Sequence, residues 1–260
     1  MFISLANFLM VALDQYEAPH LKLKYGAIHP NVLVVGDPFR TEIIGKLCDS
    51  YTELSWNREY RILNAVYNGA NLTIASHGIG GPGAAICFEE LIKLGAKIII
   101  RLGTCGSLKP LTVTQGDIVV SIAAAREDGH TQYMVPSGFP AVGDPALVTL
   151  LHRSLSTHDE RAFMGITLTH ALFYPGPASG NALKSYADSG CLTVEMEVAT
   201  LYTIASVRGI KAAACAVVDG SPFEWESGNY DPHGTKVNEG KRRMFMAGLD
   251  TLAALATRAD

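Results

Sequence analysis

Short apolar runs alternate along the chain with segments in which apolar residues recur every three or four positions. The first pattern is typical of buried strands and the second of amphipathic helices. Because the two patterns alternate, we expect a mostly parallel or mixed sheet with helices covering both faces. The predicted strands are 32–35, 61–67, 71–76, 97–102, 117–125, 165–169, 192–194 and 212–218, and the predicted helices are 41–48, 82–94, 144–156, 195–208 and 241–257.

Specific turn and capping residues mark several of these boundaries. Asn68-Gly69 stands between two apolar runs and predicts a tight hairpin turn. Either Asp37 or Thr41 is expected to cap the first helix, because a short polar side chain satisfies free amides there. The strand that contains Arg101 is predicted to be buried except for the arginine itself.

The composition is that of a folded globular domain rather than a disordered chain. Of 260 residues, 48% are hydrophobic and 18% are charged, which allows a large core. Lysine and arginine number 21 against 25 aspartate and glutamate, so the formal charge is −4, and no basic block predicts a nucleic-acid surface. No apolar run approaches the roughly 20 residues that a membrane helix needs. We therefore expect neither nucleic acid nor a membrane as a partner.

The cysteines and the amino terminus bear on the compartment and on domain organisation. Five cysteines without C-x-x-C spacing argue against a disulfide framework and a zinc site, and they favour a reducing, cytoplasmic compartment. Residues 1–19 are apolar at their start, with no basic residue ahead of the apolar run. We interpret them as a loosely packed or helical extension rather than a secretory signal, and residues 20–260 as one domain.

Polar residues gather where several of the predicted strands end. In open α/β sheets ligands bind beyond the carboxyl ends of the strands, so these positions are the first candidates for a site. Gly36 lets an anion approach the backbone, and Arg40 follows at a helix start, where the helix dipole favours anions. Arg101, followed by Gly103 and Thr104, adds a guanidinium, an amide and a hydroxyl at a second strand end. Because arginine matches the geometry of phosphate, the two strand ends together favour a small-oxyanion site.

Each arginine taken alone has a simpler interpretation. Arg40 fits a solvated residue at a helix start. Arg101 fits a buried ion pair with a core carboxylate such as Glu90, since an unpaired guanidinium inside an apolar strand is costly. Only the combination of the two, each close to a glycine, favours the anion site.

Carboxylates mark two further strand ends, at Glu195-Met196-Glu197 and at Asp219. A carboxylate in such a place can accept hydrogen bonds from sugar hydroxyls, and a partly buried one has a raised pKa and can donate a proton. The alternatives are a charge pair at a helix amino terminus for the two glutamates and a turn residue before glycine for Asp219. From the residues alone, both interpretations stay open.

One glycine-rich segment, residues 78–83 (GIGGPG), fits the G-x-G-x-x-G pattern of dinucleotide-binding enzymes. A nicotinamide-dependent oxidoreductase is therefore an alternative. Two features disfavour it: the segment follows a hairpin strand instead of opening a βαβ unit, and the next strand carries Arg101 in place of an acid. The eight histidines do not cluster at metal-ligand spacing, so no metal is expected.

Taken in order, five motifs of the chain resemble those of the nucleoside phosphorylase-I family, which contains purine nucleoside and uridine phosphorylases. They are Val34-Val35-Gly36-Asp37-Pro38-x-Arg40, Ser76-His77-Gly78-Ile79-Gly80, Ile100-Arg101-Leu102-Gly103-Thr104-Cys105-Gly106, Val194-Glu195-Met196-Glu197 and Val218-Asp219-Gly220. The similarity covers residues 20 to 258, with the motifs in family order. Residues 56–60, 139–144 and 218–225 most resemble the purine nucleoside phosphorylases of apicomplexan parasites.

The resemblance implies a fold, an activity and an assembly. The expected fold is a single-domain, three-layer α/β/α architecture whose central mixed sheet is partly barrel-like and flanked by helices. The expected activity is that of a pentosyltransferase in purine salvage, which converts purine ribonucleosides such as inosine and guanosine, with phosphate, to free base and ribose 1-phosphate. Phosphate is then a co-substrate and no cofactor is needed. The expected assembly is a homo-oligomer, a hexamer built as a trimer of dimers.

Three other activities stay open at this point. Within the family they are a uridine phosphorylase and a phosphorylase that cleaves methylthioadenosine or methylthioinosine. Uridine phosphorylases typically read uracil with Gln-x-Arg just after a Phe-Tyr-Pro-Gly-like stretch, whereas here 173–176 (FYPG) is followed by 177–179 (PAS). The alternative from another class is a nucleoside-binding protein without turnover.

The family motifs also assign roles to individual residues of this chain. Phosphate would be held by Gly36, Arg40, Arg101 and Thr104, with Arg58 reaching the site from a neighbouring subunit. Ribose would be bound by Met196 and Glu197, with His20 from a neighbouring subunit near the 5′-hydroxyl.

The base side of the site is assigned in the same way. Base contacts would come from Val194, Phe173 and Trp225, and the segment 221–240 that contains Trp225 is expected to act as a lid. Asp219 would face N7 of the purine and serve as the catalytic acid, which requires its pKa to lie above the ordinary value.

Overall fold

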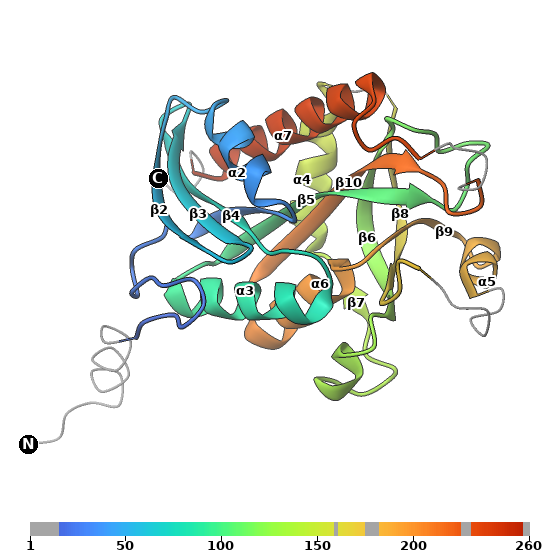
Figure 1. The fold of residues 1–260 in the computed structure, drawn as a ribbon, viewed down its shortest axis with the longest axis horizontal. Coiled ribbons are helices and arrows are strands. Elements are labelled where there is room, and N and C mark those ends of the chain that lie inside the picture. Colours follow the sequence, from blue (N-terminus) through green and yellow to red (C-terminus); the bar gives the residue numbers. More distant parts are fainter. Residues whose placement is uncertain (1–15, 159–160, 175–181, 225–229, 257–260) are drawn as a thin grey trace, which may run out of the picture.

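The computed structural model describes residues 16–158, 161–174, 182–224 and 230–256. Within these ranges the chain forms one mixed β-sheet with helices on both sides (Figure 1). The strands are β1 (Asn31–Val35), β2 (Ser50–Asn57), β3 (Tyr60–Tyr67), β4 (Ala70–Ser76), β5 (Ile98–Ser107), β6 (Ile118–Glu127), β7 (Ala141–Val142), β8 (Ala162–His170), β9 (Cys191–Glu195) and β10 (Lys211–Gly220). The helices are α2 (Pro38–Gly45), α3 (Gly81–Leu94), α4 (Pro145–Ser156), α5 (Ala182–Asp188), α6 (Val198–Arg208) and α7 (Thr235–Ala256), with a 3₁₀ turn at Thr131–Tyr133.

The sheet closes on itself at one end. Its open part runs β2-β3-β4-β1-β5, and β5 also pairs with β10, so that β5, β10, β6, β8 and β9 form a closed ring. The long strand β5 serves both parts, because Arg101 lies beside β1 while Gly106 and Ser107 pair with β9. The expectation of a mixed, partly barrel-like sheet is confirmed.

Helices pack on both faces of the sheet and bury two large apolar clusters. On one face, α3 and α6 contribute Phe88 and Tyr202 to the first cluster. On the other face, α4 and α7 contribute Leu151 and Phe245 to the second cluster, and α2 adds Ile44. Figure 1 shows α2, α4 and α7 above the strands and α3 and α6 below them. The three-layer prediction is thereby confirmed.

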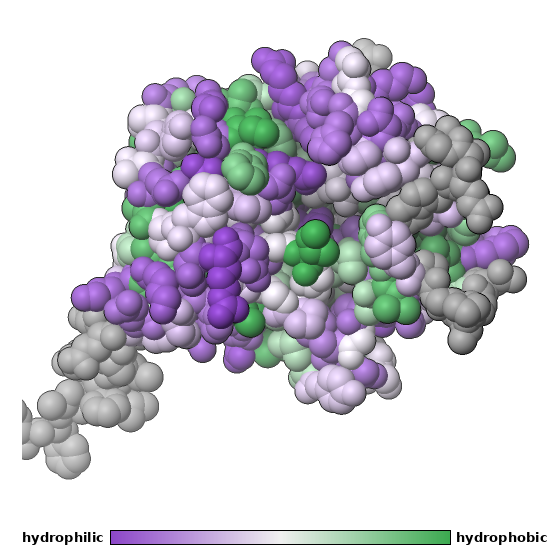
Figure 2. Space-filling model, in the orientation of Figure 1, coloured by the Kyte–Doolittle hydropathy of each residue, from purple (hydrophilic) through white to green (hydrophobic). Residues whose placement is uncertain are grey.

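The surface is mixed in character. Figure 2 shows that polar side chains predominate on the face seen in Figure 1 and that apolar ones form separate groups. Two of the exposed aromatic side chains, Phe39 and Trp56, contact edge to face with their ring centres 5.7 Å apart. Among the described helices, none combines the length and the apolar character that crossing a bilayer requires.

Most of the predicted elements are present with shifted ends. Asn68 and Gly69 have positive φ angles of 49° and 76° and form the predicted turn between β3 and β4. Asp37, not Thr41, caps the first helix, because its carboxylate accepts a hydrogen bond from the Phe39 amide at 2.9 Å. The helix α2 therefore begins earlier than predicted, and it also ends earlier, at Gly45.

The predictions for two individual residues of these elements are wrong. Arg101 is not the exposed position of its strand, since only 3% of the residue is accessible. Glu195 does not begin a helix but ends β9, and α6 begins at Val198. Of the predicted amino-terminal extension, residues 1–15 lie outside the described residues, whereas Ala18 is fully buried in the first cluster.

Candidate active site

A cavity of about 940 Å³ lies where the carboxyl ends of β1, β4, β5, β9 and β10 meet. Its position follows the rule that ligands bind beyond the carboxyl ends of the strands in α/β sheets. The predicted site residues that line it are Gly36, Arg40, Phe173, Arg101, Thr104, Val194, Met196, Glu197 and Asp219. Residues from β1, β5, β9 and β10 and from the segments that follow them are therefore brought into one cavity.

The first strand end supplies a close backbone approach and a cation. Gly36 follows β1, and a Cβ at this position would stand 3.4 Å from the Gly78 carbonyl oxygen, so the two backbones nearly touch. Arg40 lies in the first turn of α2, which Asp37 caps. Burial lowers the pKa of Arg40, against the attraction of Asp37. The guanidinium remains charged, because the pKa of arginine is so high in water.

Arg101 lies inside β5, which continues to Ser107 beyond the predicted end at residue 102, and its guanidinium is buried against two carboxylates. Its Nη2 donates to Glu197 through a short hydrogen bond and lies 3.3 Å from Oε2 of Glu195. Among the described residues, the buried atoms Nε and Nη1 have no hydrogen-bond partner. Gly103 makes room for this arrangement, since a Cβ there would overlap Nη1. Arg101 thus lines the cavity with two N–H positions that no described protein group accepts from.

Glu90, the alternative partner of Arg101, binds elsewhere. It accepts hydrogen bonds from the Leu21 amide at 2.8 Å and from Nδ1 of His20 at 2.6 Å. The simple core pair between Arg101 and Glu90 is thus wrong. The carboxylates that hold Arg101 instead belong to the Glu195–Glu197 motif, and so to the site itself.

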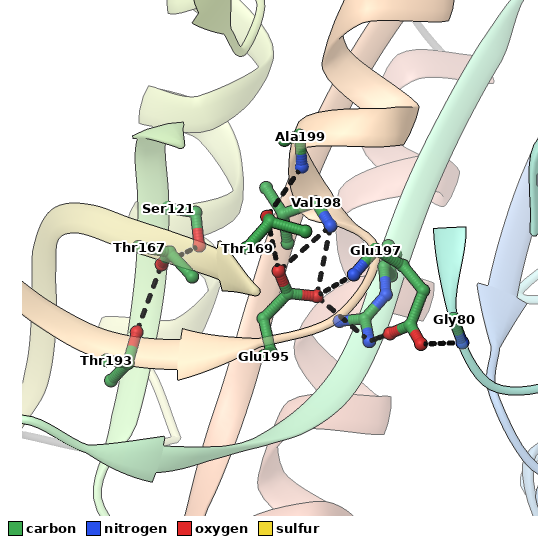
Figure 3. A network of polar contacts seen from close by, with 10 residues as sticks. Gly80, Ser121, Thr167, Thr169, Thr193, Glu195, Glu197, Val198 and Ala199 are labelled. Carbon is green, nitrogen blue, oxygen red and sulfur yellow. Dashed lines mark hydrogen bonds and ion pairs between the residues drawn. The ribbon is translucent and has the colours of Figure 1, made fainter. Parts of the chain in front are cut away.

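Glu197 is held as an anion at the border of the cavity (Figure 3). One oxygen accepts a hydrogen bond from the Gly80 amide at 2.6 Å, and the other accepts from Arg101. Burial alone would raise the pKa of Glu197, but Arg101, His77 and the Gly80 amide hold it below its ordinary value. A carboxylate fixed in this way can accept further hydrogen bonds from hydroxyl groups of a ligand.

Asp219, at the end of β10, lines the same cavity, but its pKa is shifted in the opposite direction from that of Glu197. Burial raises its pKa from 3.8 to about 6, although a hydrogen bond with Thr104 and the charges of Lys241 and Arg40 act against the rise. About a tenth of such a carboxyl is protonated at pH 7, compared with less than about a thousandth for an ordinary one. Asp219 can therefore serve as a proton donor near neutral pH.

Aromatic side chains form another part of the cavity wall. The ring of Phe173 lies 5.0 Å from that of Tyr174 and 6.4 Å from that of Tyr230, centre to centre. Tyr230 was not predicted individually, because no motif surrounds it, although it lies in the segment 221–240 that was expected to act as a lid. Within that stretch, the segment 225–229 lies outside the described residues. The predicted base contact Trp225 belongs to that segment.

His20 and Arg58 do not line the cavity of their own chain. The side chain of His20 is 38% exposed, and Arg58 is an exposed residue with φ 57° in the turn between β2 and β3. Exposure outside the cavity is what a residue that serves a neighbouring subunit requires. Their assignment to a neighbour's site stays a prediction.

The glycine-rich segment 78–83 has a different role from the one its pattern resembles. The Gly80 amide, at the amino terminus of α3, donates to Glu197 of the same chain. A Cβ at Gly81 would overlap the His130 ring, so that side of the turn is filled as well. The segment thus supports the cavity wall and does not form a dinucleotide cradle. Within the described residues, no three His, Cys, Asp or Glu side chains gather as a metal site would require.

Comparisons with known proteins agree with this geometry. A family model described as "Phosphorylase superfamily" matches residues 30–254. Over 239 residues the chain is 41% identical to the purine nucleoside phosphorylase of Plasmodium vivax, and this alignment covers 92% of this chain and 97% of the relative. It is 34% identical over 198 residues to the uridine phosphorylase of Haemophilus influenzae, covering 72% and 78% of the two chains. The solved structure of Toxoplasma gondii purine nucleoside phosphorylase in complex with immucillin-H matches with a TM-score of 0.90 at 40% identity, over 93% and 97% of the chains.

Proposed function

The chain belongs to the phosphorylase superfamily, and from this premise we propose that it is a purine nucleoside phosphorylase, a pentosyltransferase. It transfers the ribosyl group of purine ribonucleosides such as inosine and guanosine to inorganic phosphate, and it releases the free base. The observation that carries the proposal is the single cavity in which Arg101 and Arg40 stand together with Glu197 and Asp219.

The phosphate side of the cavity positions the nucleophile. Arg40, Arg101 and Thr104 supply two guanidinium groups and a hydroxyl, and Gly36 leaves the backbone open to an anion. Breaking the bond between ribose and base develops positive charge on the sugar. A phosphate dianion held beneath the sugar stabilises that charge, and its fixed position lowers the entropic barrier to attack.

The opposite side of the cavity handles the sugar and the leaving base. Glu197 accepts hydrogen bonds from the 2′- and 3′-hydroxyls, and Met196 packs against the ribose. Negative charge grows on the departing purine, and a proton delivered to N7 neutralises it. Asp219 supplies that proton, since its raised pKa keeps part of the population protonated near neutral pH.

Uridine phosphorolysis is the second candidate, because a uridine phosphorylase is among the relatives. The purine assignment has two supports. Asp219 is an acid suited to a purine nitrogen, and the sequence 177–179 (PAS) lacks the Gln and Arg that uracil recognition uses. Cleavage of methylthio-substituted purine nucleosides remains within the same proposal as a question of substrate range.

The proposal extends to the assembly, the cofactor and the compartment. At least a dimer is needed for His20 and Arg58 to complete a neighbour's site, and the family resemblance favours a trimer of dimers. The chemistry needs phosphate and no organic cofactor or metal. A reducing, cytoplasmic location fits the five cysteines, which are all free thiols.

A substrate panel tests the proposed activity. Inosine, guanosine, adenosine, methylthioinosine and uridine are each incubated with phosphate, and release of the base is followed. We expect inosine and guanosine to have the highest kcat/KM, with uridine as the pyrimidine control. A higher kcat/KM for uridine than for both 6-oxopurine nucleosides would remove the purine assignment, and binding of inosine without any release would remove the enzymatic one.

A further inference from the structure

Glu195 borders the cavity but has no substrate role in the proposed mechanism. Its side chain is only 2% exposed, so it is buried more completely than Glu197 beside it. A buried carboxylate next to an anion site is costly unless hydrogen-bond donors and a cation compensate its charge, because it repels the anion and loses its own hydration. Its contacts show which groups provide that compensation.

Every hydrogen-bond partner of Glu195 is a donor. Oε2 accepts from the Glu197 amide at 2.7 Å and Oε1 from the Thr169 hydroxyl at 2.6 Å, and both oxygens lie 3.0 Å from the Val198 amide (Figure 3). The Thr169 oxygen accepts from the Ala199 amide at 2.8 Å, which leaves its proton for Glu195. Burial and the charge of Glu197 raise the pKa of Glu195, whereas Arg101, the Thr169 hydroxyl and the Glu197 amide favour its charged form and fix its orientation.

The remaining donor to Glu195 is Arg101. Its Nη2 lies between Oε2 of Glu195 and an oxygen of Glu197. This leaves Nε and Nη1, which are buried and have no protein partner among the described residues. Glu197 alone would let the guanidinium turn about their shared contact, whereas two carboxylates on one nitrogen fix its plane. Buried N–H groups without partners are rare and costly, which is the pattern expected of a site waiting for an acceptor.

We propose that Glu195 is a positioning residue for phosphate: it holds Arg101 by Nη2 and so fixes the plane of the guanidinium at the wall of the cavity where the oxyanion binds. The inference rests on the proposed function, since phosphate is the anion that Arg101 binds. It separates the two glutamates of the motif. Glu197 touches the sugar, while Glu195 acts only through Arg101 and through the backbone amides at the start of α6.

The variant Glu195→Gln tests this proposal by the direction in which it changes KM for phosphate. Its amide keeps the shape of the side chain but places an NH₂ group among donors, so it cannot hold Arg101 in the same way. If positioning dominates, KM for phosphate rises about tenfold to a hundredfold, while KM for inosine changes less than about threefold. If Glu195 acted only as a nearby negative charge, its removal would lower KM for phosphate, and this result would overturn the proposal.

A second pair of variants keeps the carboxylate and changes only what orients it. Thr169→Val removes the hydroxyl that donates to Glu195, whereas Thr169→Ser retains it. We expect a weaker phosphate affinity by calorimetry in Thr169→Val and recovery in Thr169→Ser, and equal affinities in the two would contradict the proposal. This pair decides the question if Glu195→Gln fails to fold.

Two controls separate the possible failures. Asp144→Asn changes a carboxylate that caps α4 through the Leu147 amide and does not line the cavity, so it should leave KM for phosphate unchanged. The unmodified protein is assayed first. If it cleaves inosine without any dependence on phosphate, the proposed function fails. If its cleavage depends on phosphate and the variants leave phosphate affinity intact, only the role of Glu195 fails.

Discussion

Replacement of Asp219 by asparagine should make the protein more stable at neutral and alkaline pH while it impairs catalysis. Asp219 is 7% exposed, and burial raises its pKa from 3.8 to about 6. A rise of about two units means that ionising this carboxyl in the folded protein costs about 3 kcal/mol more than in the unfolded chain. Asparagine keeps the shape and the hydrogen bond with Thr104 but never ionises.

The direction of the pH dependence follows from the raised pKa. Below about pH 4 the carboxyl is protonated in both the folded and the unfolded chain, so it carries no ionisation cost. Between about pH 4 and pH 6 the folded protein holds its proton longer, so the wild type loses stability as the pH rises. Above about pH 6 the loss is complete. The stability advantage of Asp219→Asn therefore grows from near zero to about 3 kcal/mol across this window.

Unfolding at two pH values measures the effect. At fixed protein concentration and without phosphate, the midpoint of thermal unfolding is compared at about pH 4 and about pH 8 for both proteins. For a chain of this size, 3 kcal/mol corresponds to about 6–12 °C at the higher pH. The control Asp144→Asn exchanges one good capping residue for another and should show little change at either pH. A constant difference, or a variant less stable than wild type at the higher pH, would refute the raised pKa of Asp219.

Three further substitutions have defined outcomes. Arg101→Ala should raise KM for phosphate at least about a hundredfold, because a guanidinium bound to a dianion is lost. Initial rates should show a smaller effect on KM for inosine, and equal effects on both substrates would contradict this. Gly103→Ala should likewise raise KM for phosphate, because a Cβ there overlaps the Arg101 guanidinium, while the far-ultraviolet circular dichroism spectrum stays unchanged. A normal KM for phosphate would show that Arg101 does not need the space that Gly103 leaves. Gly69→Ala should cost about 1 kcal/mol in urea unfolding and leave kcat unchanged, because φ is 76° and no atom lies within 4 Å of the added Cβ; a loss of activity would mean that the hairpin communicates with the site.

The sequence predicts the parts of the fold that local patterns encode. Apolar runs located most strands, and Asn68-Gly69 specified its turn, because few residues other than glycine and asparagine adopt positive φ angles easily. The strand β2 was missed because most of its residues are exposed and it has no apolar run. Closure of the barrel was expected only from the family resemblance, because pairing of β5 with β10 depends on contacts between distant parts of the chain.

For the site, too, the sequence predicts single residues but not the contacts between distant ones. Strand ends indicated Arg101, Glu197 and Asp219 individually, since a charged residue next to an apolar run is visible in the sequence. The pairing of Arg101 with a carboxylate 96 residues away was not visible, and Glu90 was an equally reasonable partner from composition alone. The role of Glu195 was hidden for a related reason: its function lies in four donors that only the packed structure brings together.

Formation of ribose 1-phosphate tests the central claim most directly, because it asks whether the cavity binds phosphate as the nucleophile. Inosine is incubated with the protein in phosphate-free buffer and again with added phosphate, and the sugar product is identified by phosphorus NMR and by a reducing-sugar assay. We expect hypoxanthine and ribose 1-phosphate in equal amounts when phosphate is present, and no cleavage without it. Release of hypoxanthine and free ribose at the same rate in both buffers would contradict the account.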